Sequence, residues 1–148
     1  MENKYEGLKL RNQLCFPLYS VSNLIIRRYK PLLDKLNLTY TQYITMMVLW
    51  ERESISEKEL SSALFLKSNT LTPLLRKLVN KGYIHIDKNI YDERSIVISL
   101  TERGRQLKDE AVCVPASMAS AINLSAEEAV YLYNILYKIL EVKSRKKY

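Results

Sequence analysis

Arg94 and Asp92 are the residues whose types and spacing most clearly suggest a chemistry, because they lie two positions apart in a charged stretch of this 148-residue chain. An arginine side chain is attracted into the narrow, electronegative minor groove of DNA, and a nearby carboxylate can pair with it and orient it. An ordinary ion pair on the surface is the alternative. The stretch is therefore a candidate for contact with DNA.

A segment just upstream carries polar side chains on one helical face. Its apolar residues recur at helical spacing and predict an amphipathic helix, capped by Ser68, with a stripe of Leu71, Leu74, Leu75, Leu78 and Val79. A helix with one apolar and one polar, basic face can lay side chains against base edges in the major groove. A solvated helix face is the alternative. The side chains expected to contact DNA are Ser68, Asn69, Thr70, Thr72, Arg76 and Lys77.

The two cysteines, Cys15 and Cys113, offer a different chemistry. A reactive cysteine has to be accessible and partly ionised, and a helix N-terminus favours the ionised form. Pro17 lies inside an apolar segment, so the chain either kinks there or begins its main helix at this proline. Cys15 is then expected near a helix N-terminus. The alternative for Cys15 is a small buried hydrophobic residue.

Apolar periodicity and capping residues predict the elements that position these side chains. The first helical segment covers residues 8–36, and its apolar residues are spread over more than one face. Thr39 with Gln42, and Ser56 with Glu59, have the spacing of capping boxes and predict helices that begin directly after them. We expect the first of these helices to be a scaffold and the second to be short.

After the polar-faced helix, the pattern changes from helical to alternating. The alternating apolar residues are Ile84 and Ile86, then Ile96, Ile98 and Leu100. They predict a β-hairpin over residues 83–100 with a loop over residues 89–95, which places Asp92 and Arg94 in the loop. We therefore expect a winged helix-turn-helix DNA-binding domain over residues 39–100, with the hairpin as its wing.

The C-terminal part is predicted to be helical. Thr101 can cap a helix that is interrupted near Pro115, and Ser125 with Glu128 forms a third capping box before the last helix. The apolar residues of that last helix leave almost no polar side: Val130, Leu132, Tyr133, Ile135, Leu136, Ile139, Leu140 and Val142. Such a helix needs partners all round.

Both terminal segments are thus more apolar than one buried face requires. The simplest solution is that residues 8–36 and 102–148 pack together as dimerisation helices, so we expect an obligate homodimer. The expected fold class is mainly α with a small β-hairpin. We expect residues 1–148 to form a single unit, in which the winged helix-turn-helix domain is joined to the dimerisation helices.

Composition narrows the class of partner. The formal charge of +7 and the pI near 9.4 favour a polyanion such as nucleic acid, although they also suit an anionic membrane surface. No apolar run reaches the roughly 18 residues that a membrane span needs, and the N-terminus lacks the apolar core of a signal peptide. We therefore expect a cytoplasmic protein without a membrane partner.

An enzyme built on a cysteine, such as a thiol peroxidase, is the alternative from another class. The single histidine, His85, lies in the strand alternation and is expected to face solvent, so no Cys–His pair is evident. Three scattered glycines form no phosphate-binding loop, and no cluster has metal-ligand spacing. We expect no enzyme activity, no metal and no cofactor.

Several motifs resemble those of MarR-type transcriptional regulators. Asp92-Glu93-Arg94, followed by Leu100-Thr101 and Gly104, resembles the wing signature of that family. The motifs that resemble its OhrR, MgrA and SarZ branch of organic-peroxide sensors are Leu14-Cys15-Phe16, Tyr29-Lys30-Pro31-Leu32-Leu33, Leu38-Thr39-Tyr40-Thr41-Gln42-Tyr43 and Thr70-Leu71-Thr72-Pro73-Leu74-Leu75. The resemblance covers essentially the whole chain. It implies a homodimeric repressor that binds a pseudo-palindromic operator in double-stranded DNA and is released by thiol oxidation.

The resemblance also implies roles for the sensor residues. Cys15 matches the cysteine that an organic hydroperoxide oxidises to a sulfenic acid. Tyr29 and Tyr40 match two tyrosines of the partner subunit that hydrogen-bond to its thiolate, although either one taken alone could be a core or interface residue. Cys113 lies where some members have a second cysteine that closes an intersubunit disulfide, while other members use a low-molecular-weight thiol. An inert core thiol is the alternative for Cys113.

A ligand-controlled repressor is the second function that the sequence leaves open. In this alternative a small phenolic or anionic ligand binds between the dimerisation and DNA-binding parts, where a tyrosine-rich, methionine-containing interface could line its pocket. Replacement of Cys15 by serine separates the two functions. Loss of regulation favours thiol oxidation, whereas ligand-induced release that survives the substitution favours the ligand.

Overall fold

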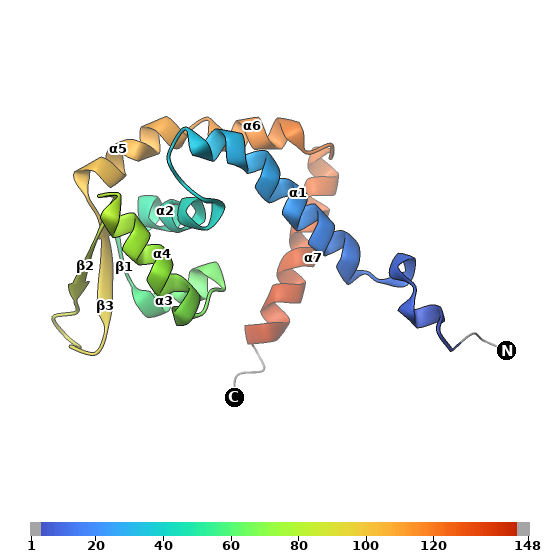
Figure 1. The fold of residues 1–148 in the computed structure, drawn as a ribbon, viewed down its shortest axis with the longest axis horizontal. Coiled ribbons are helices and arrows are strands. Elements are labelled where there is room, and N and C mark those ends of the chain that lie inside the picture. The colour runs from blue at the N-terminus through green and yellow to red at the C-terminus, as the bar shows by residue number, and fades with distance from the viewer. Residues whose placement is uncertain (1–3, 145–148) are drawn as a thin grey trace. The chain divides into compact units, whose positions relative to one another are not determined.

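The computed structural model describes residues 4–144, with side chains described as far as residue 141. The chain forms two compact units, residues 1–115 and residues 116–148. The elements of the first unit are, in order, the 3-10 helices η1 (Glu6–Leu8) and η2 (Leu10–Asn12), then α1 (Cys15–Asp34), α2 (Tyr40–Arg52), β1 (Ser54–Ser56), α3 (Glu57–Leu64), α4 (Ser68–Asn80), β2 (Ile84–Lys88), β3 (Ile96–Leu100) and α5 (Glu102–Ala111) (Figure 1). Helix α6 (Val114–Ala121) begins at the end of this unit, and α7 (Ala126–Ser144) lies in the second. The predicted mainly α fold class is confirmed.

The sheet of the first unit has three antiparallel strands in the order β1-β3-β2, one strand more than the predicted hairpin. Strands β2 and β3 form the wing, with Ile84 opposite Leu100, and residues 89–95 connect them as predicted. The additional strand β1 places Ile55 opposite Ile98. Because β1 has only three residues, its sequence is too short to show an alternating pattern.

Capping residues begin the helices where the sequence predicts them. Thr39 Oγ1 accepts the N–H of Gln42 at 3.3 Å, and the Thr39 N–H donates to Gln42 Oε1 at 3.1 Å, which closes the capping box of α2. Ser56 and Glu59 form the same reciprocal pair before α3. Thr101 caps α5. These predictions are confirmed, and the caps fix where each of these helices begins.

Helix α1 is shorter than the apolar pattern predicts. The pattern extends over residues 8–36, whereas α1 runs from Cys15 to Asp34 and is preceded by the two 3-10 helices. Pro17 is the third residue of α1, where the missing N–H of proline falls in the first turn and breaks no helical hydrogen bond. The main helix therefore begins close to this proline, which places Cys15 at its N-terminal end as expected.

Helix α4 differs from its prediction at both ends. Its N-cap is Lys67, whose backbone is extended (φ −80°, ψ 155°), and no side chain caps it. Ser68 is already the first helical residue, so the predicted cap by Ser68 is wrong. At the other end Val79 is 39% exposed, because it is rotated by about 100° from the buried Leu78. The buried stripe therefore consists of leucines alone.

The C-terminal helices follow the predicted breaks. Helix α5 ends at Ala111 and α6 begins at Val114, so the interruption lies just before Pro115. In the second unit, the N–H of Glu128 donates to Ser125 Oγ at 3.1 Å, and the N–H of Ser125 donates to Glu128 Oε2 at 2.8 Å. This is the third predicted capping box, and it is confirmed.

Helix α7 exposes apolar side chains on several sides. Those that are exposed are Val130, Tyr131, Leu132, Tyr133, Ile135, Tyr137 and Ile139. Such a helix needs a partner that covers it, because exposed apolar side chains in these numbers are unfavourable in water. Within residues 4–144, neither α7 nor any other helix combines the length and the apolar character needed to cross a membrane.

Candidate DNA-binding surface and thiol site

The polar face of α4 is exposed, while its opposite face is anchored in the core. Leu71 and Leu78 have no exposed surface, and Leu75 is 1% exposed, so these leucines fix the rotation of the helix. The predicted DNA contacts that lie together on the exposed face are Ser68, Asn69, Thr70, Thr72, Arg76 and Lys77. The packing of α4 thus presents all of them to solvent from one rigid element.

The N-terminus of α4 carries no negative charge. Its first turn contains no acidic residue, and its N-cap Lys67 makes no side-chain hydrogen bond to the helix. The hydroxyl of Thr72 donates to the Ser68 carbonyl at 2.8 Å and is therefore engaged within the helix. Main-chain N–H groups at such a helix start are suited to a phosphate oxygen, since they lack partners and lie at the positive end of the helix dipole.

The wing loop is shaped by its own side chains. Asp92 Oδ1 accepts the N–H of Arg94 at 3.0 Å, and Asn89 Oδ1 accepts the N–H of Tyr91 at 2.9 Å. The first contact replaces the predicted ion pair, because none of the salt bridges within residues 4–144 includes Arg94. Aspartate readily bonds to the main chain two residues further on, so the loop is fixed while the Arg94 side chain stays exposed.

The loop also exposes two large side chains that the sequence did not single out. Ile90 and Tyr91 are 91% and 93% exposed, and both directly precede the Asp92–Arg94 turn. Apolar residues in a charged loop give no periodic signal, so the sequence pattern could not identify them.

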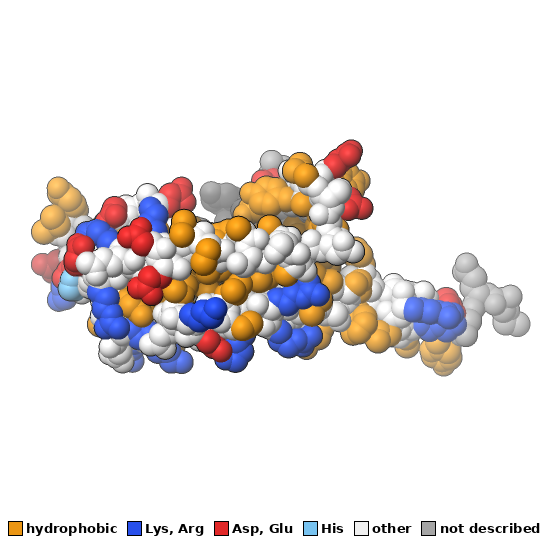
Figure 2. Space-filling view, turned by 90° about the horizontal axis from the view of Figure 1, so that it is seen from above, with side chains coloured by type: hydrophobic (Ala, Val, Ile, Leu, Met, Phe, Trp, Pro, Cys, Tyr) orange, Lys and Arg blue, Asp and Glu red, His pale blue; other side chains and the backbone are white. Residues whose placement is uncertain are grey.

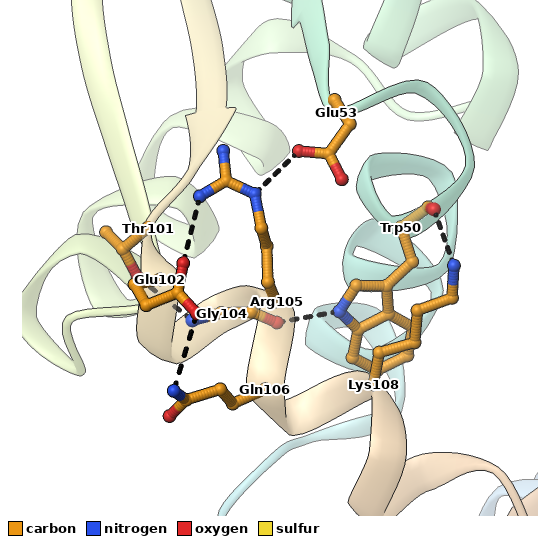
Figure 3. Close-up of polar contacts among 8 residues, drawn as sticks. All are labelled: Trp50, Glu53, Thr101, Glu102, Gly104, Arg105, Gln106 and Lys108. Atoms are coloured by element: carbon orange, nitrogen blue, oxygen red, sulfur yellow. Dashed lines mark hydrogen bonds and ion pairs between the residues drawn. The ribbon is translucent and has the colours of Figure 1, made fainter.

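The base of the wing is joined to α2 by polar contacts (Figure 3). The indole N–H of Trp50 donates to the main-chain carbonyl of Gly104 at 2.8 Å, and the ammonium of Lys108 donates to the Trp50 carbonyl at 3.1 Å. Arg105 Nε donates to Glu53 Oε2 at 2.9 Å. Sequence analysis missed this junction, because its partners lie 52 to 58 residues apart along the chain.

A glycine is required at this junction. A Cβ on Gly104 would overlap the carbonyl oxygen of Tyr83 and lie 3.1 Å from its carbonyl carbon and 3.2 Å from Leu100 Cδ2. Thr101 Oγ1 accepts the Gly104 N–H at 3.0 Å and donates to the Gly82 carbonyl at 2.6 Å. The Leu100-Thr101 and Gly104 motif thus holds the two wing strands against the start of α5.

Cys15 is exposed at the first position of α1. Its neighbours are also exposed, with Leu14 at 74% and Phe16 at 44%, and Leu14 provides no side-chain hydrogen bond to the helix start. Figure 2 shows hydrophobic side chains at the surface of the end of the first unit that carries the N-terminus. The thiol is therefore accessible, and the apolar side chains next to it in sequence are exposed as well.

The two predicted sensor tyrosines lie against each other. The ring centroids of Tyr29, on α1, and Tyr40, the first residue of α2, are 4.9 Å apart, and Tyr43 lies 5.8 Å from Tyr29. Burial raises the pKa of Tyr29, and the nearby phenols of Tyr40 and Tyr43 add to the effect. Burial also raises the pKa of Tyr40. Both phenols therefore stay protonated near neutral pH and can donate a hydrogen bond.

The tyrosine pair is far from the thiol of its own chain. Tyr29 follows Cys15 by fourteen residues on the same helix, which corresponds to about 21 Å along the axis. A phenol cannot bridge that distance with a hydrogen bond. Cys113, the other cysteine, is exposed in the turn between α5 and α6. The structure thus brings Tyr29 and Tyr40 together, and leaves the Cys15 thiol separate from Tyr29 within one chain.

Comparison with known proteins identifies the family. The family model described as transcriptional regulator SarA/Rot matches residues 27–111. The organic hydroperoxide resistance transcriptional regulator of Bacillus subtilis is 44% identical over 146 residues, which cover 99% of each chain. The chain belongs to the MarR family of transcriptional regulators. Another MarR-family relative, SarZ of Staphylococcus epidermidis, is 40% identical over 86% of this chain and 84% of its own.

Solved structures agree with this assignment. AbfR of Staphylococcus epidermidis, in its overoxidised form bound to DNA, has a TM-score of 0.75 and is 34% identical over 94% of this chain and 98% of its own. A disulfide form of AbfR gives a TM-score of 0.66 at 33% identity, over 93% and 94% of the two chains. Reduced MarR from E. coli gives 0.67 at 25% identity, over 86% and 96%. The winged helix-turn-helix fold predicted for this MarR-family chain is thereby confirmed.

Proposed function

We propose that this chain is a homodimeric repressor that binds a pseudo-palindromic operator and releases it when an organic hydroperoxide oxidises Cys15. The observation that carries the proposal is the exposed thiol at the start of α1 together with a half-buried pair of phenols, Tyr29 on α1 and Tyr40 on α2. The relatives named as organic hydroperoxide resistance regulator and as oxidised, DNA-bound AbfR support the same function.

Two elements of the first unit make the DNA contacts in this proposal. The exposed face of α4 lies in the major groove, where Asn69, Thr70, Arg76 and Lys77 are placed for base edges and phosphates. The wing lies beside it, and Arg94 enters the minor groove from a loop that Asp92 holds in shape. The positive end of α4 binds a phosphate.

A second copy of the chain completes the sensor. In the proposed dimer, residues 8–36 and 102–148 cover one another, while residues 39–100 form the DNA-binding domain of each copy. The distance of about 21 Å between Cys15 and Tyr29 along α1 rules out their contact in one chain. An antiparallel arrangement of two α1 helices brings Cys15 of one copy to the phenols of the other, where two O–H donors stabilise the thiolate.

Oxidation then proceeds at the thiolate of Cys15. The sulfur attacks the outer oxygen of the hydroperoxide, the O–O bond breaks, and the alkoxide leaves and takes a proton to become an alcohol. The sulfur is oxidised by two electrons to a sulfenic acid, which is larger than the thiol. Each protein reacts once, so we expect stoichiometric oxidation and no turnover with added reductant.

The oxidised sulfur releases DNA by changing the dimer. The sulfenic acid needs more space than the thiol and loses the hydrogen bonds from Tyr29 and Tyr40, so the α1 interface repacks. Two half-sites of an operator lie about 34 Å apart, and a dimer must present both α4 helices at that spacing. A rotation of the subunits therefore ends simultaneous docking.

An operator titration tests the proposal. The chain, its Cys15→Ser variant and its Arg94→Ala variant are titrated with operator DNA before and after one equivalent of an organic hydroperoxide. We expect oxidation to weaken binding of the wild type but not of Cys15→Ser. Arg94→Ala should weaken binding in both states while Cys15 is still oxidised. Equal oxidation-induced loss in Cys15→Ser would remove the thiol from the mechanism.

Cys113 is proposed to resolve the sulfenic acid. Its thiolate attacks the Cys15 sulfur of the partner subunit, a disulfide forms, and water leaves. The exposed position of Cys113 between α5 and α6 and the disulfide form of the relative AbfR support this step. Non-reducing gels should show a covalent dimer after hydroperoxide treatment that Cys113→Ser abolishes. A monomeric band in the oxidised wild type would indicate that a low-molecular-weight thiol reacts instead.

A cavity in the first unit favours the ligand-controlled repressor as a second candidate. It has a volume of about 510 Å³ and is lined by Lys35, Leu36, Asn37, Tyr83, Arg103, Gln106, Leu107 and Glu110. The two cationic side chains suit a small aromatic carboxylate. Benzoate would then release the operator from Cys15→Ser as well as from the wild type, whereas thiol oxidation alone predicts no effect of benzoate on either.

A further inference from the structure

Two side chains that directly follow α4 reach the connection between α1 and α2. The ammonium of Lys81 donates to the main-chain carbonyl of Asn37 at 2.6 Å and to Gln42 Oε1 at 2.8 Å. The hydroxyl of Tyr83 donates to the Leu36 carbonyl at 3.3 Å. The end of the DNA-binding helix is thus attached to a segment 39 to 47 residues earlier in the chain.

The attachment is partly buried and shares an atom with the cap of α2. Gln42 is 2% exposed and Tyr83 is 4% exposed. Gln42 Oε1, which accepts from Lys81, also accepts the N–H of Thr39 in the capping box. The Lys81 ammonium therefore bonds directly to the group that fixes the start of α2, and Tyr40 is the first residue of that helix.

The connection itself has little freedom. Only residues 35–39 separate α1 from α2, and Asn37 has a left-handed backbone (φ 54°), which few residues adopt. Tyr29 and Tyr40 lie on either side of this connection with their rings 4.9 Å apart. A displacement of either ring therefore moves a short, constrained segment whose carbonyls are held from the end of α4.

We propose that Lys81 and Tyr83 are positioning residues that transmit the state of the Tyr29–Tyr40 pair to the DNA-binding helix α4. When the hydrogen bonds from the phenols to Cys15 are lost, the connection shifts, and Lys81 and Tyr83 carry α4 with it. This inference rests on the proposed thiol-sensing function. It adds a path within each subunit to the rotation of the two subunits.

The chemistry of Lys81 fits a positioning role better than a purely stabilising one. Burial lowers the pKa of Lys81, and the charge of Lys77 adds to the effect, so the ammonium occupies a place that is unfavourable for its charge. Two hydrogen bonds, to the Asn37 carbonyl oxygen and to Gln42 Oε1, offset this unfavourable burial of the charge. Because both acceptors are held in place, they also fix the direction of the Lys81 side chain. An apolar side chain of similar length could fill the space but could not bind both oxygens.

The ratio of operator Kd in the oxidised state to that in the reduced state tests the inference. Allosteric coupling typically corresponds to a factor of about 5–150 in affinity. We expect Lys81→Met to reduce the wild-type ratio by about fivefold or more, and Lys81→Arg to restore most of it. The matched control is Lys58→Met, which removes an equal charge from α3. The Lys58 side chain is exposed and forms no hydrogen bond or ion pair with any described residue.

A second variant, Tyr83→Phe, keeps the inference testable if Lys81→Met fails to fold. Tyr83→Phe removes one hydroxyl and keeps the buried ring, so the core stays filled, and it should lower the ratio in the same direction as Lys81→Met. Mass spectrometry of Cys15 confirms equal oxidation in every variant. Wild-type ratios in both Lys81→Met and Tyr83→Phe would overturn the inference and leave the proposed function intact. A wild-type ratio of one with Cys15 fully oxidised would instead overturn the proposed function, and this inference with it.

Discussion

The proposed DNA-binding domain and the proposed dimerisation helices differ in how much of their apolar surface a single chain buries. In the proposed DNA-binding domain, residues 39–100, Leu71 and Leu78 have no exposed surface. In the segments proposed to form the dimer interface, Leu14, at the start of α1, is 74% exposed, and Val130, on α7, is 62% exposed. The first region therefore buries its apolar side chains within one chain, whereas the proposed function needs a second copy to cover the other.

This difference explains how one protein can be both stable and responsive. Buried leucines and the junction around Gly104 keep the DNA-binding surface in a fixed shape. In the proposed dimer, an interface between two copies can have alternative packings, and one added oxygen atom at Cys15 would select among them. Substitutions in the two regions should consequently affect different properties, namely folding in the one and assembly in the other.

The largest effect is expected from Gly104→Ala, which disturbs the junction between the wing and the start of α5. The new methyl would overlap the Tyr83 carbonyl oxygen, and backbone cannot move aside as a side chain can. We expect a loss of about 3 kcal/mol or more in the free energy of unfolding, measured by urea denaturation. Gly7→Ala is the control, since a Cβ there meets nothing within 4 Å and should leave stability unchanged.

Ile139→Gln changes an apolar side chain of α7 that the proposed dimer would bury. Ile139 is 51% exposed in one chain, and the proposed dimer covers it. Losing a buried isoleucine from an interface costs about 1.5–3 kcal/mol, so the dimer Kd should rise at least about tenfold, measured by sedimentation. Lys138→Gln, one position away, should have little effect. An unchanged dimer in Ile139→Gln would contradict the proposed role of α7.

The elements of the fold that could be predicted from the sequence are those whose partners lie close together along the chain. The capping boxes of Thr39 and Ser56 were predictable because both partners lie within three residues. The apolar excess of the terminal helices was equally visible. Strand β1 was not, since three residues carry no period, and its pairing with β3 depends on residues more than forty positions away.

For the site, periodicity sufficed to predict which face of α4 is exposed, but not how its neighbours are held. The sequence predicted an ion pair between the Asp92 and Arg94 side chains, whereas the Asp92 carboxylate accepts the main-chain N–H of Arg94 instead. The contacts of Lys81 with Asn37 and of Trp50 with Gly104 join residues 44 and 54 positions apart. Their chemistry depends on tertiary packing, which a pattern along the chain does not describe.

A smaller effect within the proposed DNA-binding domain is expected from Trp50→Phe. Phenylalanine lacks the indole N–H that reaches the Gly104 carbonyl, and the buried carbonyl loses that partner. We expect a loss of about 1–2 kcal/mol in the free energy of unfolding. Lys108→Met removes the neighbouring contact to the Trp50 carbonyl from an exposed side chain and should cost less. Equal losses for the two would mean that burial does not govern this junction.

The smallest effect concerns Tyr29, which lies where the two regions meet. Its raised folded-state pKa means that above about pH 10 the unfolded chain loses the phenol proton while the folded chain retains it. The unfolded state then binds fewer protons, so stability falls as pH rises through this range. Tyr29→Phe has no such proton, and its stability should fall less steeply than that of the wild type.

Urea denaturation of both proteins at several pH values provides the measurement. Below about pH 8 the phenol is protonated in both states, so the difference in unfolding free energy between wild type and Tyr29→Phe should be constant there. Lysine titration near the same alkaline range is common to both proteins and cancels in the difference. Parallel curves through the alkaline range would show that Tyr29 is not held by burial, and would weaken the view that it is a protonated donor for the thiolate of a second copy.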